Sequence, residues 1–106
     1  MKNQSWVHEE TKTFAALAQE YIPYAEINKA TSTTHRDKNR LQYLLEAFGK
    51  KKLAEITVQD VEQYKQNRRK VVKPATVNRE LALFRHMLSK AMDWEYLNKT
   101  PTRTVK

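Results

Sequence analysis

Residues 74–94 read PATVNRELALFRHMLSKAMDW, and this stretch predicts the long helix on which the fold depends. Pro74 suits the first turn of a helix, where its missing amide hydrogen costs little. Apolar side chains then recur at helical spacing and give the helix one stripe that faces a core: Val77, Leu81, Phe84, Leu88 and Ala91. We expect this helix to end near Trp94 and Pro101 to begin an extended tail.

A second helix is predicted over residues 32–48. Thr34 with Asp37 three residues later is typical of a capping box, with aspartate in place of the usual glutamate. The buried stripe then follows: Leu41, Leu44, Leu45 and Phe48. We expect Gly49 to cap the end of the helix in a left-handed conformation, which glycine adopts without strain.

Two more helices are predicted at about 13–27 and 57–69. The first has a stripe at helical spacing, Phe14, Leu17, Ala18, Tyr21 and Ala25, and Pro23 is expected to kink or end it. Thr57 and Asp60 repeat the capping pattern at the start of the other. Between the helices predicted at 32–48 and 57–69, Leu53 and Ile56 are expected to fill the core.

Length and composition favour a single all-α domain. A chain of 106 residues can build one modest core, and its one glycine and three prolines are too few for the turns of a β-rich protein. We therefore expect a compact bundle of four helices over residues 13–100. A flexible lead-in at 1–12 should precede it, and 101–106 should begin a linker.

The charge balance favours a polyanionic partner. Twenty Lys and Arg against 12 Asp and Glu give a formal net charge of +8, which attracts nucleic acid. The chain has no cysteine, and His8, His35 and His86 are scattered, so we expect no metal and no cofactor. No stretch resembles a signal peptide or a membrane span, so we expect a cytoplasmic protein with no membrane partner.

Cations collect on one face of two helices when the sequence is placed on a helical projection. Opposite the stripe of the 74–94 helix, two alanines lie among the cations, so a DNA groove could come close to the backbone. The outward face of the 32–48 helix is similar, and more cations lie in the loop before residue 74. The candidate DNA-binding residues are His35, Arg36, Asn39, Arg40, Tyr43, Arg69, Lys70, Lys73, Asn78, Arg79, Arg85, His86 and Lys90.

Other interpretations stay open for several of these residues. Cations opposite a hydrophobic stripe are often only a solvated face, although two such helices with basic loops favour a binding surface. Asn39 and Asn78 could read adenine edges, or could cap a helix or contact phosphate. Leu83 and Met87, off the main stripe, could offer an apolar patch to a protein partner, which makes a helical protein-interaction module the alternative function.

A self-contained enzyme is not expected. Tyr43 and Tyr64 could in principle be nucleophiles, but tyrosines at helical spacing are more often core or rim residues. The chain offers no set of arginine and histidine partners that would stabilise a phosphoryl transition state beside them.

The order of these signals resembles a known family, the N-terminal core-binding domain, often called SAM-like, of phage-integrase-type tyrosine recombinases. One stretch carries the resemblance through Leu53, Ile56, Thr57, Asp60, Val61, Tyr64 and Arg68. The run from Ala75 to Leu97 carries it further, with Thr76, Asn78, Leu81, Arg85 and Ala91 at matching positions. Two departures lie in the exit turn: Glu95 where the family often has glycine, and Thr100 where it often has asparagine.

The resemblance implies a role in DNA recombination. It implies that this domain and a catalytic domain expected after Pro101 close as a clamp around duplex DNA at the crossover site, for integration or excision of a mobile element. It adds Thr76 to the candidate DNA contacts. The implied partners are double-stranded DNA, the recombinase's own catalytic domain and other recombinase subunits, with the fragment alone monomeric and not itself an enzyme.

Overall fold

The computed structural model describes residues 12–94, which form four α-helices and one short 3₁₀ turn. The elements are α2 (Phe14–Asn28), α3 (Thr31–Phe48), η1 (Leu53–Glu55), α4 (Val58–Arg69) and α5 (Pro74–Asp93). Within this part of the chain the only β-type pairing is an isolated bridge between Thr13 and Lys52. The all-α bundle predicted from the sequence is therefore confirmed. The expectations for the lead-in before Lys12, for Glu95 and Thr100, and for the linker lie outside the described residues.

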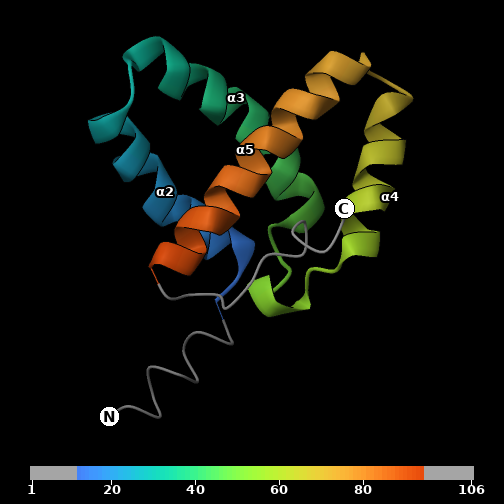
Figure 1. Ribbon diagram of the computed structural model, residues 1–106, viewed down its shortest axis with the longest axis horizontal. Helices are drawn as coiled ribbons and strands as arrows, with labels where there is room; N and C mark the ends of the chain where they lie inside the picture. The colour runs from blue at the N-terminus through green and yellow to red at the C-terminus, as the bar shows by residue number, and fades with distance from the viewer. Residues whose placement is uncertain (1–11, 95–106) are drawn as a thin grey trace.

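Helix α5 holds the bundle together because it packs against each of the other three helices. In Figure 1 it crosses in front of α2 and α3, while α4 lies beside its N-terminal end. Pro74 stands in its first turn, as predicted. None of the helices in residues 12–94 is long and apolar enough to cross a membrane.

The centre of the core is a cluster of four aromatic rings, one from each α-helix. Phe48 of α3 stacks on Phe84 of α5 with 4.7 Å between ring centroids. Phe14 of α2 lies 5.5 Å from Phe84, and Tyr64 of α4 lies 5.3 Å from Phe48. Aromatic pairs at such separations add to the free energy of burial, so this cluster fixes how the four helices meet.

The capping box predicted at Thr34 and Asp37 is wrong. Helix α3 begins at Thr31, one residue before the predicted start, and its N-cap residue Ala30 offers no side-chain cap. Thr34 and Asp37 therefore lie inside the helix, and both are buried. There the Thr34 hydroxyl donates to the Ala25 carbonyl of α2 at 3.1 Å, so these polar side chains tie α3 to its neighbour instead of capping it.

Gly49 follows α3 as expected, but its predicted left-handed conformation is wrong. Its φ is −55° and its ψ is −38°, which any residue adopts. A Cβ built on Gly49 would lie 2.5 Å from the carbonyl oxygen of Leu45. Glycine is required here by close backbone approach and not by a positive φ.

Two other local signals have clear outcomes. The Thr57 hydroxyl accepts from the Asp60 amide at 3.1 Å while Asp60 accepts from the Thr57 amide at 3.0 Å, so the capping box of α4 is confirmed. Pro23 lies inside α2, which continues to Asn28, so the proline does not end that helix.

Candidate nucleic-acid interface

Helices α3 and α5 bring predicted site residues together in one open depression of about 240 Å³. Arg40 and Asp37 line it from α3, and Lys29 lines it from the turn that leads into α3. The remaining lining residues lie on α5: Arg79, Ala82, Leu83 and His86. Three residues predicted independently on two helices, Arg40, Arg79 and His86, therefore belong to one surface feature.

The α3 side of the candidate interface is mainly solvent-exposed. His35, Arg36 and Asn39 are exposed, as a DNA-contacting role requires. Arg40 is half-buried, and its Nη1 lies 4.0 Å from Asp37 Oδ1. The outward face predicted from the sequence therefore exists on α3, with Arg40 at its border with α5.

The α5 side presents Asn78, Arg79 and Arg85 to solvent, together with the small residues Ala75 and Ala82. Thr76 is half-buried. Among the ion pairs of residues 12–94, none involves Arg79 or Arg85, so the charge of each is uncompensated within the described chain. The loop cations Arg69, Lys70 and Lys73, which precede this helix, are exposed as well.

His86 and Lys90 are less accessible than the projection implied. The His86 ring packs edge-on against Tyr21 at 5.8 Å, and its buried Nε2 has no hydrogen-bond partner among the described residues. Burial, followed by the nearby charges of Lys29 and Lys90, lowers the pKa of His86. The Lys90 ammonium lies over the Tyr24 ring at 4.7 Å. Both side chains therefore contribute to packing between α5 and α2.

A buried ionic network between α4 and α5 was not predicted from the sequence. Tyr64 Oη donates to Glu80 Oε1 at 2.6 Å, and Arg68 donates to the same carboxylate through Nε at 3.0 Å and Nη2 at 2.7 Å. Glu80 is 1% exposed. Burial, reinforced by Glu80, raises the pKa of Tyr64, so its hydroxyl stays protonated.

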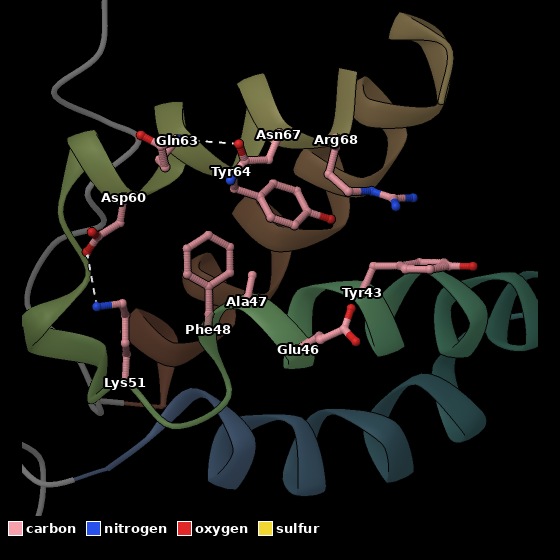
Figure 2. Close-up of a pocket in the computed structure, with 10 residues that line it drawn as sticks. All are labelled: Tyr43, Glu46, Ala47, Phe48, Lys51, Asp60, Gln63, Tyr64, Asn67 and Arg68. Atoms are coloured by element: carbon pink, nitrogen blue, oxygen red, sulfur yellow. Dashed lines mark hydrogen bonds and ion pairs between the residues drawn. The ribbon is translucent and has the colours of Figure 1, made fainter. Parts of the chain in front are cut away.

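This network reaches the predicted interface through Tyr43. The Arg68 guanidinium lies over the Tyr43 ring at 4.2 Å from its centroid, an arrangement that can be followed in Figure 2. Tyr43 is 39% exposed, so one face of the ring is covered and the remainder is open to solvent. A sequence signal did exist: Glu80 falls one turn from Val77 and Phe84 on the apolar side of its helix, where an acidic residue needs a cationic partner.

The apolar patch predicted at Leu83 and Met87 is wrong. Leu83 is 5% exposed and Met87 is fully buried, because both pack into the common core. A groove of about 360 Å³ does lie between α3 and α4 (Figure 2), but charged side chains of both signs, such as Lys51 and Asp60, line it together with the aromatic ones. The observation that suggested a protein-interaction module is therefore removed.

The class defined by these features is a small, basic, all-helical domain whose exposed cations lie on two helices in contact. The family model "phage integrase, N-terminal domain" matches residues 10–106, which is nearly the whole chain. The chain therefore belongs to the phage integrase N-terminal domain family, and the resemblance noted from the sequence is confirmed. No curated protein and no solved structure matches it significantly. In tyrosine recombinases this N-terminal domain is a non-catalytic region.

Proposed function

We propose that this domain binds duplex DNA with the exposed faces of α3 and α5, and that it holds the crossover site of a tyrosine recombinase during integration or excision of a mobile element. The observation that carries the proposal is the meeting of Arg40 and Arg79, from two different helices, at one surface depression. Membership of the integrase family supports the same conclusion.

The domain positions DNA and does not cleave it. The tyrosine predicted as a possible nucleophile on α4 is buried and donates its hydroxyl proton to Glu80. The other, Tyr43, lies beneath a guanidinium that is itself bound to Glu80. Phosphate contacts fix the register and orientation of a protein on DNA, so the role we assign is to present the scissile phosphate to a tyrosine of a catalytic domain.

Recognition of bases is secondary in this proposal. Asn39 and Asn78 are exposed and have the amide groups that can read an adenine edge. Ala75 and Ala82 are small, so a groove edge can approach the α5 backbone closely. A catalytic domain linked to this one would raise its effective concentration at the DNA, so the isolated domain should bind as a weak, weakly specific monomer.

The first test is a salt titration of the 106-residue chain with a fluorescent DNA duplex. With roughly five to eight phosphate contacts, affinity should fall by a factor on the order of a thousand between about 50 and about 200 mM salt. Arg79→Ala and Arg85→Ala should each weaken binding to every duplex sequence, because phosphate contacts carry no sequence information.

Lys38→Ala is the matched control. Lys38 is an exposed cation of α3, but it lies outside the predicted interface and is paired with Glu26 at 2.8 Å. The Lys38→Ala substitution removes one positive charge, as each arginine substitution does, but it should change DNA affinity much less than either arginine variant. Absence of binding at low salt, or equal losses in all three variants, would contradict the proposed interface.

A further inference from the structure

The depression between α3 and α5 has the charge of an anion site. Lys29, Arg40 and Arg79 line it, against one carboxylate, Asp37. Its α5 wall includes Ala82, which is small and exposed, so a ligand can reach the helix surface between the cations. The lining cations come from the α2–α3 turn, from α3 and from α5, so the site exists only in the folded bundle.

The carboxylate in the depression is already neutralised by a closer cation. Lys29 Nζ donates to Asp37 Oδ2 at 2.8 Å and also to the Tyr21 hydroxyl at 2.8 Å. Burial lowers the pKa of Lys29, but its hydrogen bonds and electrostatic attraction to Asp37 and Tyr21 together outweigh burial and raise the pKa, so Lys29 stays charged. The Asp37 side chain is only 9% exposed, so it faces the protein more than the solvent.

Arg40 lies beside Asp37 but keeps hydrogen-bond donors that a ligand can use. The distance of 4.0 Å between Arg40 Nη1 and Asp37 Oδ1 is that of a loose ion pair, which leaves guanidinium donors available for a ligand. Arg79 takes part in no ion pair within residues 12–94. Two guanidinium groups with available planar donors, at one depression, match the oxygens of a tetrahedral phosphate.

We propose that this depression is a phosphate-binding site in which Arg40 and Arg79 hold a single backbone phosphate of the DNA between α3 and α5. Asp37 lies beside Arg40 in the site, and Lys29 compensates the charge of Asp37. The inference rests on the proposed function and deepens it, because it assigns two cations of the interface to one shared phosphate and not to two separate ones.

A double-mutant cycle on duplex DNA tests the sharing. Arg40→Gln and Arg79→Gln keep the polar side-chain stems, and each should weaken binding about tenfold, the value of a charged hydrogen bond. Because both arginines hold the same phosphate, the pair should weaken binding by clearly less than the product of the two losses. The slope of log affinity against log salt should fall by about one in the double variant.

Arg79→Gln with Arg85→Gln is the matched cycle. Arg85 is exposed on α5 and does not line the depression, so its losses should multiply with those of Arg79 and the salt slope should fall by about two. If the wild-type chain binds DNA but the affinity losses of Arg40→Gln and Arg79→Gln multiply in the double variant, the shared site is overturned and the proposed function still stands.

Inorganic phosphate provides an arm that does not depend on DNA. In an NMR titration at constant ionic strength, phosphate should shift the Nε–H signals of Arg40 and Arg79 and the ring signals of His86 along one saturable curve. The same titration of the Arg40→Gln/Arg79→Gln chain should leave His86 unshifted. Equal shifts at Arg36 and Arg85, or no saturation, would show only diffuse attraction and would overturn the site even if DNA binds.

Discussion

At the residue scale, Glu80 is a buried acidic side chain that joins α4 to α5. It is buried with its carboxylate bound to Tyr64 and Arg68, so its charge is tolerated only because of these partners. Removing it would leave the Arg68 guanidinium, which is 16% exposed, without a counter-charge. It would also free the Arg68 guanidinium from the carboxylate that holds it over the Tyr43 ring, so the loss should disturb the side of α3 that we propose to bind DNA.

We therefore expect Glu80→Ala to lower the free energy of unfolding by about 2 to 3 kcal/mol, somewhat below the usual range for a buried pair because Arg68 is not fully buried. Urea denaturation measures the change. Glu46→Ala, at an exposed glutamate that makes no ion pair within residues 12–94, should stay within about 0.5 kcal/mol of wild type. Similar midpoints for the two variants would show that the Glu80 network adds nothing to stability.

The residues that could not be placed from the sequence share one cause. A projection with one apolar stripe gives a helix a single buried side, but α5 packs against α2, α3 and α4, so its buried arc is wider. Glu80, Leu83 and Met87 lie in that extra arc, and His86 lies at its edge. Arg79 and Arg85 were placed correctly as exposed, although each lies one turn from a buried leucine of α5. A long guanidinium side chain can extend from such a position into solvent.

At the element scale, the two threonine–aspartate pairs show which local signals are sufficient. Both pairs have the same spacing, yet only Thr57 and Asp60 cap a helix. Chain packing decides between them: Thr34 reaches a carbonyl of α2, and Asp37 reaches Lys29. Helix existence and approximate bounds, including the start of α3, followed from periodicity, whereas the roles of Thr34 and Asp37 depended on tertiary contacts that local spacing does not encode.

The capping box of α4 should be worth about 1 kcal/mol, so Thr57→Ala should lower the free energy of unfolding by that amount. Thr31→Ala is the control, because Thr31 also stands at a helix start but neither it nor Ala30 before it makes a side-chain cap bond. Equal thermal midpoints for the two threonine variants would contradict the cap.

The same capping box makes stability depend on pH through Asp60. The hydrogen bond from the Thr57 backbone amide is the main cause that lowers the pKa of Asp60. The stability that Asp60 contributes is therefore present above about pH 4 and is lost as the pH falls through the lowered pKa of the folded state.

At the scale of the whole molecule, the net charge of +8 acts on stability and on binding with opposite dependence on salt. Without DNA, the excess cations repel one another in the compact state, and salt screens this repulsion. We therefore expect the free chain to have a higher thermal midpoint at about 200 mM salt than at about 50 mM salt. With DNA, the midpoint should exceed that of the free chain, because a ligand that binds only the folded state stabilises it.

The difference between the two midpoints should shrink over the same salt range. At low salt a duplex present at about 100 times its dissociation constant adds about 2.7 kcal/mol, and the loss of affinity on adding salt removes most of this gain. Melting curves with and without duplex, at both salt concentrations, measure the convergence. The Arg40→Gln/Arg79→Gln chain should show a smaller DNA-induced rise at low salt, but its free midpoint should not fall, since neither arginine makes a close ion pair in the described fold. A DNA-induced rise independent of salt would mean that contacts other than phosphate dominate binding.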